Sequence, residues 1–397
     1  MPDVWTAEQL SEACGESVER LTSYAELGLL QRAGDGLSYT GDALHRLGLI
    51  RFARARGVDE QRLGQAVAEQ GDLLSVFDYL SEAEPTELTL EQAAARAGLD
   101  ADLVSVLVEV LGWDPTERAT NEDVDALDLL SQALQLGLSR EPLVQVVRVL
   151  ADMLDRLADA EVRTFHDYVH EQFRASGLSG SQLLEASQSL AKPLLALVEP
   201  AVTYFHRRAF ERANQEDLLR HLLEATTAPA STPGESQATV MFIDLAGFTP
   251  LTVAMGDAGA AEVLRKFATL VRASTAQHGG RIIKQIGDAF MVTFLDPCDA
   301  VRCGVALLTA VEAEADFPGL HIGAHHGRVL FTEGDYVGGA VNLAARVAGA
   351  TGENEFLVTA DLYAAVSRDV TAQFTELPER ELKGLAEPAR LFAVSLA

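Results

Sequence analysis

The chain has 397 residues, 48% of them hydrophobic, which is enough for two or three domains with ordinary cores. Its formal net charge of −28 argues against broad attraction to DNA, RNA or anionic lipid, since those partners bind clustered cations. The sequence shows no signal peptide, no apolar run near the ~18 residues of a membrane span, and no metal-ligand spacing among its three cysteines. We therefore expect a cytoplasmic protein with no membrane partner.

The first half of the chain is expected to be wholly helical and to contain an internal repeat. Thr6-Ala-Glu-Gln9, followed by Cys14-Gly15, recurs as Thr89-Leu-Glu-Gln92, followed by Ala97-Gly98. Each copy predicts a helix, a tight turn, a second helix, a loop and a third helix.

The first copy, residues 1–80, contains the segment SYAELGLLQRAGDGLSYTGDALHRLGLIRFARARGV. With this segment it resembles the MerR-like winged helix-turn-helix, a unit that binds DNA in its own family. This stretch carries seven Lys and Arg against thirteen Asp and Glu, and its one basic cluster is Arg46, Arg51, Arg54 and Arg56. DNA contact needs a basic recognition face. We therefore expect a packing or regulatory module, with DNA not a partner.

Residues 84–224 predict a second helical unit followed by long amphipathic helices. Leu and Val recur at helical spacing through 143–162 and 181–223. The apolar surface exceeds what a thin monomeric rod could bury, which favours a dimer interface. Residues 225–237 are rich in Ala, Thr, Ser, Pro and Gly and predict a linker.

Residues 238–397 alternate short β-rich runs, among them 321–326 and 328–332, with helical stretches, so the whole chain is expected to be α+β. The run that begins at Thr239 is a buried-type strand ending on Asp244. The residues Gly247, Phe248 and Thr249 then lead into a helix, whose first amides suit phosphate oxygens.

A second carboxylate follows in a predicted tight hairpin with Gly287 and Asp288 at its turn. If the two strands are neighbours, Asp244 and Asp288 meet at one sheet edge. Paired carboxylates there can hold two Mg²⁺ or Mn²⁺ ions against a triphosphate. Taken singly, Asp244 is better interpreted as a helix cap and Asp288 as a hairpin turn residue.

The third segment runs from Asp335 through Gly339 to Arg346 and predicts a helix that starts near Gly339. Asn342 and Arg346 are four residues apart and would share one face of it. An amide beside a guanidinium suits an anionic transition state, although such a pair is more often a solvated face.

Together these segments resemble the class III adenylate/guanylate cyclase catalytic domain, with its ferredoxin-like βαβ fold, over essentially all of residues 238–397. The motifs are the strand before Asp244 with LAGFT, then IIKQIGD, DYVGGAVNLAARV and ELKGLAEPARLF. The resemblance implies that Asp244 and Asp288 bind two Mg²⁺ or Mn²⁺ ions per active site. It implies that Asn342 and Arg346 position the ribose and stabilise the transition state. Lys383 matches a phosphate contact.

By the same resemblance, Lys284 and Asp335 read the base. Lys only donates and ionised Asp only accepts, which matches the acceptor N1 and donor N6 of adenine. Guanine presents the reverse edge, and the buried mismatch would give discrimination on the order of 10⁴ or more. We therefore expect ATP as substrate and cyclic AMP as product.

In this family each site is shared, with metal carboxylates from one partner and base readers, Asn and Arg from the other. One chain here holds both sets, which implies a head-to-tail homodimer. The helical half would then modulate how the half-sites align, by ~1–3 kcal/mol. Four histidines could make that switch sensitive to pH, namely His166, His170, His206 and His221.

Two other functions stay open from the sequence alone. The chain could be a DNA-binding regulator whose degenerate cyclase domain senses a nucleotide, but no metal or transition-state residue is missing. It could be another two-metal enzyme, such as a diguanylate cyclase or polymerase palm, but the Lys284/Asp335 pair argues otherwise. His325 and His326 are expected on a sheet strand rather than on a metal.

Overall fold

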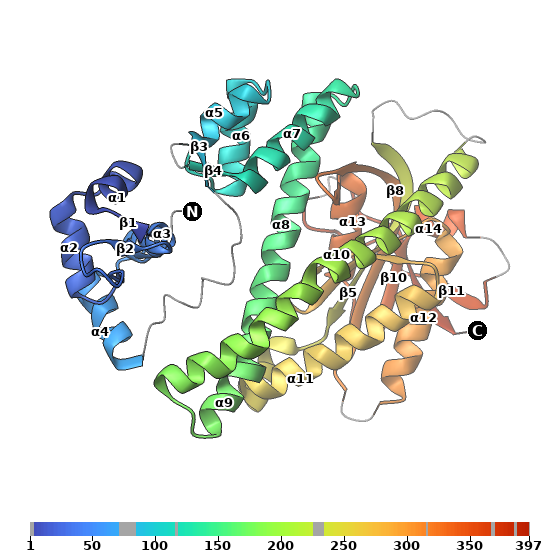
Figure 1. The fold of residues 1–397 in the computed structure, drawn as a ribbon. Coiled ribbons are helices and arrows are strands. Elements are labelled where there is room, and N and C mark those ends of the chain that lie inside the picture. Colours follow the sequence, from blue (N-terminus) through green and yellow to red (C-terminus); the bar gives the residue numbers. More distant parts are fainter. Residues whose placement is uncertain are drawn as a thin grey trace. The chain divides into compact units, whose positions relative to one another are not determined.

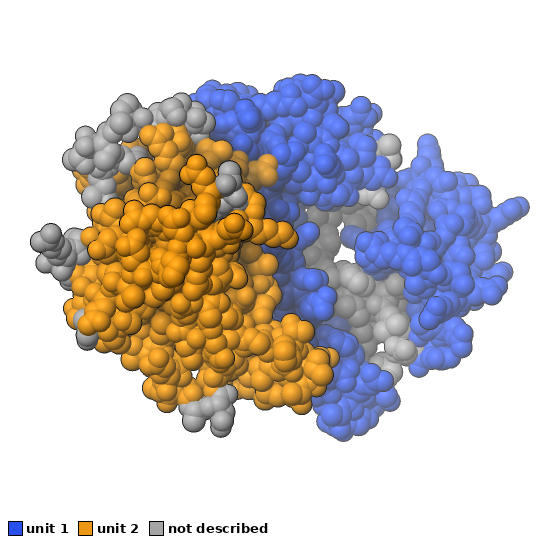
Figure 2. Space-filling view, turned by 180° about the vertical axis from the view of Figure 1, so that it is seen from behind, with its two compact units in different colours: residues 1–212 blue, residues 213–397 orange. Residues whose placement is uncertain are grey.

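A computed structural model describes residues 4–70, 85–115, 118–224, 234–314, 317–366, 370–384 and 387–396. The chain divides into two compact units, residues 1–212 and 213–397, which are coloured separately in Figure 2. Most of the predicted linker, residues 225–233, lies outside the described residues.

The structure confirms the internal repeat in the first unit. The first copy contains α1 (Ala7–Cys14), α2 (Val18–Glu26), α3 (Ala43–Ala55) and α4 (Glu60–Gln70), with β1 (Val4–Trp5) paired to β2 (Tyr39–Thr40). The second contains α5 (Leu90–Arg96), α6 (Ala101–Leu111) and α7 (Asn121–Gln135), with β3 (Pro85–Thr89) paired to β4 (Arg118–Thr120). Neither ribbon was expected from the sequence, because strands this short show too little alternation to detect.

The repeated letters have a physical role at the start of each copy. Thr6 accepts a hydrogen bond from the amide of Gln9, whose side chain accepts in return from the Thr6 amide. Thr89 and Gln92 form the same capping box at the start of α5. Each box satisfies two helix-end amides that would otherwise lack partners, so the two copies start their helices identically.

Both predicted long helices are present. They are α8 (Arg140–Phe165) and α10 (Gly180–Glu224), separated by a π-helical turn at His166–His170 and by α9 (Glu171–Ala175). Large apolar side chains stay exposed along them, including Val146, Leu150, Met153, Leu197, Tyr204, Phe205 and Phe210. Among the described helices, none combines the length and apolarity that crossing a membrane requires.

The second unit is built on an eight-stranded sheet, in which seven strands follow the order β11-β12-β10-β8-β5-β7-β6 and the eighth, β9, pairs with β8. Its strands are β5 (Glu235–Leu245), β6 (Arg281–Ile286), β7 (Ala289–Phe294), β8 (Leu320–Thr332), β9 (Asp335–Val337), β10 (Glu355–Thr359), β11 (Ala372–Glu376) and β12 (Leu391–Leu396). Its helices are α11 (Phe248–Gln277), α12 (Pro297–Glu312), α13 (Gly339–Ala348) and α14 (Ala360–Ala365).

Strand β5 is central and serves both faces of the sheet (Figure 1). Met241 and Ile243 join the main core with residues of α11 and α12. Val240 belongs to a second core on the other face, where Phe242 and residues of α13 also pack. Because side chains alternate along a strand, Asp244 lies on the α13 side of the sheet.

One expectation about the strands was wrong. The runs 321–326 and 328–332 read as two separate strands, but they form the single strand β8, with Gly327 inside it. A Cβ at Gly327 would lie 2.6 Å from Nε2 of His325 and 3.3 Å from Cβ of Ala340 on α13. The glycine therefore marks close packing against α13 rather than a strand end.

Gly323 on the same strand yields a test of this packing. A Cβ there would lie 2.0 Å from the backbone nitrogen of Ala348 at the end of α13. We expect Gly323→Ala to lower the free energy of unfolding by about 1–3 kcal/mol, because helix and strand must separate. The midpoint of thermal unfolding measures this.

Gly349→Ala is the matched control, at the end of the same helix. Its added Cβ would meet its nearest neighbour at 3.6 Å, and its φ of −66° suits any residue. We expect a change within about 0.5 kcal/mol. Equal unfolding midpoints for the two variants would contradict the close-packing explanation.

Candidate active site

The sheet register brings the two predicted carboxylates to the same place. Strand β5 pairs with β7 so that Asp244 lies opposite Ala289. Asp288 is the residue just before Ala289, in the two-residue turn between β6 and β7, where Gly287 has a φ of +60°. Glycine tolerates this left-handed conformation without strain. The turn chemistry and the strand pairing thus place Asp288 beside the end of β5.

The environment of Asp244 disfavours its negative charge. Burial raises its pKa above the ordinary value, the negative charge of Asp288 raises it further, and the nearby His321 acts in the opposite direction. One carboxylate oxygen, Oδ1, is buried and has no hydrogen-bond partner within the described chain. Such an orphaned oxygen is costly unless a donor or a cation reaches it.

These residues fit a divalent cation of the Mg²⁺ or Mn²⁺ type. Carboxylate oxygens are the ligands that such hard ions prefer, and a cation would satisfy the orphaned Asp244 oxygen. Across the described ranges, no group of three or more His, Cys, Asp and Glu side chains could hold a metal. A site with two protein carboxylates instead suits ions that keep water and substrate phosphates as their other ligands.

The loop after Asp244 forms the start of α11. Gly247 has a left-handed φ of +65°, and the helix begins at Phe248. Phe248 is half-buried against the main core, whereas Thr249 is exposed. The first amides of a helix have no partner within it and attract anions. Phe248 thus anchors a loop whose amides are available next to the carboxylates.

The predicted base-reading residues form an ion pair. Lys284 lies on β6 and Asp335 on β9, and Nζ of Lys284 contacts Oδ2 of Asp335. The other carboxylate oxygen accepts a hydrogen bond from the amide of Tyr336 at 2.8 Å. The side chains are 38% and 32% exposed, so the pair adds little stability by itself. Its donor and acceptor are instead partly open to a ligand.

Asn342 and Arg346 lie on α13, which begins at Gly339 as expected. Asn342 is exposed. Arg346 donates a hydrogen bond from Nη1 to the carbonyl oxygen of Gly384 at 3.3 Å, which brings the exposed Lys383 into the same region. Within the described chain, no hydrogen bond or ion pair joins Asn342 or Arg346 to Asp244 or Asp288.

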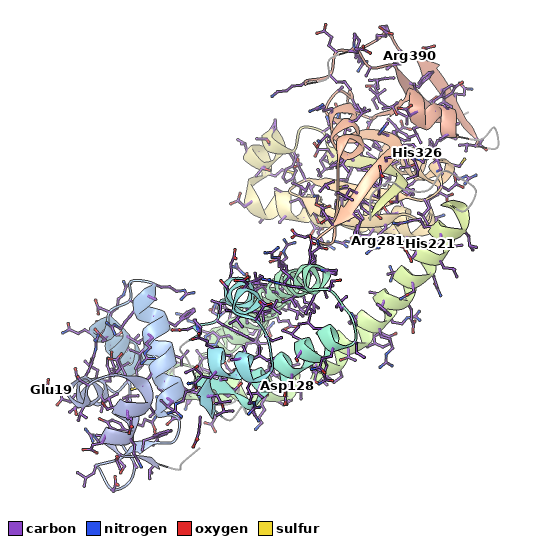
Figure 3. The ribbon with its side chains drawn as sticks, turned by 90° about the horizontal axis from the view of Figure 1, so that it is seen from above. Glu19, Asp128, His221, Arg281, His326 and Arg390 are labelled. Atoms are coloured by element: carbon purple, nitrogen blue, oxygen red, sulfur yellow. The ribbon has the colours of Figure 1, made fainter. Side chains whose placement is uncertain are left out.

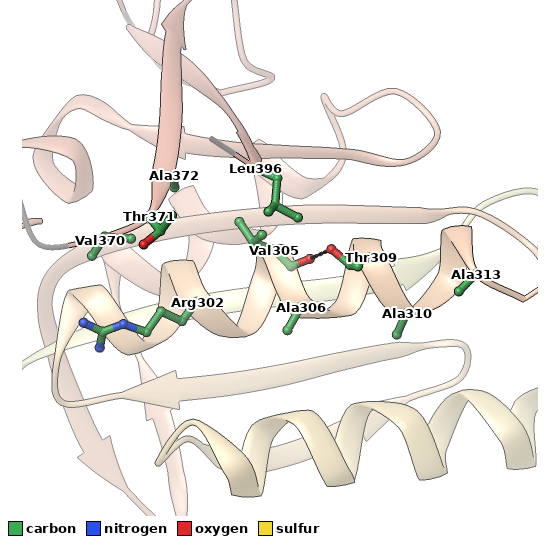
Figure 4. Close-up of a pocket in the computed structure, with 10 residues that line it drawn as sticks. All are labelled: Arg302, Val305, Ala306, Thr309, Ala310, Ala313, Val370, Thr371, Ala372 and Leu396. Atoms are coloured by element: carbon green, nitrogen blue, oxygen red, sulfur yellow. Dashed lines mark hydrogen bonds between the residues drawn. The ribbon is translucent and has the colours of Figure 1, made fainter.

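A separate groove lies between α12 and the strands β11 and β12 (Figure 4). Its volume is about 540 Å³, and its lining is mostly apolar, with Val305, Ala306, Val370 and Leu396 among the residues. None of the candidate residues lines it. The groove is therefore distinct from the candidate site.

His325 and His326 lie on β8, as expected, and bind hydroxyl groups (Figure 3 labels His326). Nδ1 of His325 is 2.8 Å from Oγ1 of Thr359, and Nδ1 of His326 is 2.9 Å from Oγ1 of Thr239. Burial lowers the pKa of both imidazoles. Both histidines therefore bind hydroxyl groups of the sheet in surroundings that disfavour their charged form.

Sequence reasoning missed two neighbours of the site. His321 pairs with Asp244 across the β5–β8 register and opposes the rise in its pKa. Tyr336, directly after Asp335, receives a hydrogen bond from Arg220 on α10. Strand pairing would have revealed His321, but no local pattern points to Arg220.

Comparison with known proteins gives two family matches. Residues 231–395 match the adenylate and guanylate cyclase catalytic domain. Residues 27–207 match the adenylate cyclase regulatory domain. The resemblance of residues 1–80 to a MerR-like unit stays a prediction.

Relatives match along most of the chain. A pH-sensitive adenylate cyclase of Mycobacterium tuberculosis is 27% identical over 88% of this chain and 87% of the relative. An uncharacterised protein of Mycobacterium bovis is 30% identical over 87% of this chain and 89% of the relative. Among solved structures, the adenylyl cyclase CyaB from P. aeruginosa is 23% identical, with a TM-score of 0.37 over 40% of this chain and 94% of that one.

The buried His325 and the half-buried His326 predict a dependence of stability on pH. Their pKa values are lower in the folded than in the unfolded chain, so the unfolded chain binds more protons once the pH falls below about 6.5. We expect the free energy of unfolding to drop below that pH, by at most about 1.4 kcal/mol per pH unit for each histidine. Urea unfolding at pH 7 and pH 5.5 measures the drop.

The variant with both His325→Gln and His326→Gln should show a smaller drop, since glutamine does not titrate. His221→Gln is the control, because the side chain of His221 is 68% exposed. Equal drops in the double variant and the unaltered protein would contradict the assignment.

Proposed function

Because the chain belongs to the class III adenylate cyclases, we propose that it converts ATP to 3′,5′-cyclic AMP and pyrophosphate. The observation that carries this proposal is the pair of carboxylates at neighbouring strand ends, with a buried Asp244 oxygen that lacks a partner. The family matches and the relatives named adenylate cyclase support it. The three cysteines all lie within the described residues and form no disulfide, which supports a location in the reducing cytoplasm.

Asp244 and Asp288 would hold the two Mg²⁺ or Mn²⁺ ions. When bound, such ions neutralise the charge of a triphosphate and lower the pKa of a ribose hydroxyl. The amides that begin α11, next to Gly247, would bind phosphate oxygens. Binding of a cation would also hold Asp244 in its charged form, against the effect of burial.

The partly exposed pair of Lys284 and Asp335 would recognise the base. The Lys284 ammonium donates to N1 of adenine, and the Asp335 carboxylate accepts from N6. Guanine would place a donor opposite the Lys284 ammonium and an acceptor opposite the Asp335 carboxylate. Polar groups at the site would then be left unpaired. Selectivity for ATP would therefore follow from this pair.

Arg346 and Asn342 would act on the reacting end of the nucleotide. Arg346 is held by the Gly384 carbonyl, so its guanidinium is positioned before substrate arrives. The charge that develops on the transferred phosphate would be stabilised by Arg346, while Asn342 orients the ribose. The exposed Lys383 beside it would add a phosphate contact.

The activity can be tested directly. Purified protein with ATP and Mg²⁺ or Mn²⁺ should yield cyclic AMP, whereas GTP should yield far less cyclic GMP, with products identified by mass spectrometry. Asp288→Asn, which removes one metal-binding charge, should lower kcat by about 100-fold or more. If neither ATP nor GTP yields a cyclic nucleotide with either Mg²⁺ or Mn²⁺, the proposal is refuted.

We propose further that the site is shared between two copies of the chain arranged head to tail. The absence of a direct contact between the Asn342/Arg346 pair and the carboxylates within the described chain supports this arrangement. Each copy would then supply one half of two equivalent sites. The apolar residues exposed along α8 and α10 would give the dimer additional contact area.

Mixing two inactive variants tests the shared site. Asp288→Ala and Arg346→Ala should each be inactive, because both sites of each homodimer lack one residue. In an equal mixture, half of the dimers would carry one intact site, so about a quarter of normal activity should return. A mixture that stays inactive although mixed dimers form would exclude the shared site.

The helical half is proposed to modulate the enzyme, since residues 27–207 match a regulatory domain. The imidazoles of His166 and His170 stack in the π-helical turn, with centroids 5.2 Å apart. Protonating both would set two positive charges against each other. His166 also lies 3.8 Å from a carboxylate oxygen of Glu171.

The dependence of activity on pH tests this regulation. The full chain and residues 232–397 should differ in their profiles between pH 5 and 8, because only the full chain carries the stacked pair. His166→Gln with His170→Gln should bring the full chain closer to the short form. Superimposable profiles for the full and short forms would rule out control by pH.

A further inference from the structure

The last turns of α10 contact the catalytic sheet at two points within the second unit. Arg220 donates a hydrogen bond from Nη2 to the hydroxyl of Tyr336 at 3.0 Å. Nη1 of Arg281 lies 3.5 Å from Oε2 of Glu216. Figure 3 shows Arg281 beside the part of α10 that carries His221. Glu216 and Arg220 are one helical turn apart and therefore face the sheet together.

Both contacts fall next to the proposed base-reading residues. Tyr336 directly follows Asp335 on β9, and Arg281 begins β6, the strand that carries Lys284. Strand β6 is at the edge of the sheet, and the short β9 pairs only with β8. Strands of this kind are less constrained by the sheet than central ones. A contact from α10 therefore restrains β6 and β9 more than it would restrain a central strand.

The hydroxyl of Tyr336 depends on Arg220 for its partner. The side chain of Tyr336 is 3% exposed, and its ring packs edge-on against Phe331 at 5.0 Å. The same core includes Ala340 and Ala344 of α13. A buried hydroxyl needs a hydrogen-bond partner, and losing it costs about 1–3 kcal/mol. Without the hydrogen bond from Arg220, we expect β9 to shift.

We propose that Arg220 is a positioning residue for recognition of the base. Through Tyr336 it holds β9, and with it Asp335, at the spacing from Lys284 that adenine requires. The ion pair of Glu216 with Arg281 restrains β6 from the same helix. The inference rests on the proposed role of Lys284 and Asp335 in reading adenine and adds a residue from outside the catalytic motifs.

The test compares kinetics with ATP and GTP. Arg220→Gln should lower kcat/KM for ATP by about tenfold, mainly through KM, the loss expected for one hydrogen bond to a charged group. The ratio of kcat/KM for ATP to that for GTP should fall at least fivefold. Arg220→Lys, which keeps a donor, should recover part of both values.

Tyr336→Phe provides a second approach to the same contact. It should reproduce the effect of Arg220→Gln, and the double variant should be no worse than either single one, because both remove one interaction. If Arg220→Gln does not fold, Tyr336→Phe alone decides by the same two measurements. Lys284→Met serves as the positive control for lost base selectivity.

Arg208→Gln is the matched negative control, since Arg208 lies on the same helix and pairs with Glu211 at 2.9 Å. It should leave both parameters within twofold of the unaltered protein. The inference is overturned if Arg220→Gln and Tyr336→Phe, with normal thermal midpoints, leave the ATP-to-GTP ratio unchanged. It is also overturned if they lower kcat equally for both nucleotides, since that outcome indicates only a structural role.

Failure of the proposed function has a different signature. In that case the unaltered protein itself makes no cyclic nucleotide. Equilibrium binding of fluorescent ATP and GTP analogues then decides the inference, with Arg220→Gln expected to weaken the ATP analogue about tenfold relative to the GTP analogue. Equal effects on the two analogues would overturn it.

Discussion

The antiparallel register between β5 and β7 is the constraint on which the candidate site depends. It sets Asp244 opposite Ala289 and so places Asp288 beside it. Successive side chains of β5 also lie on opposite faces of the sheet. Met241 and Ile243 are buried in the main core, while Asp244 faces the α13 side. A slip of one residue would move Asp244 into the main core and abolish the pair.

Charge is the second constraint, since an acidic chain must here accommodate a polyanion. Burial raises the pKa of Asp244, and repulsion from the Asp288 carboxylate raises it further. With divalent ions bound, the paired negative charges would instead favour binding of the nucleotide. The remaining positive charge is supplied locally, by Lys284 on β6 and by Arg346 near Lys383.

Helix α10 links these features to the rest of the chain. It is continuous from Gly180 to Glu224 and so extends from the first compact unit into the second. Its last turns hold the strands that carry Lys284 and Asp335 through Tyr336 and Arg281. These contacts connect α10 to the neighbours of the proposed base-reading residues.

The sequence alone determined the helical first half, its repeat, the Gly287-Asp288 turn and the start of α13 at Gly339, because capping and turn signals act over a few residues. The chemical roles of Asp244, Asp288, Asn342 and Arg346 stay predictions. Only the tertiary structure decided that β8 is one strand, that buried threonines bind the histidines, and that Arg220 reaches Tyr336. Those contacts join residues far apart in the chain, and no local pattern encodes which distant side chains will meet.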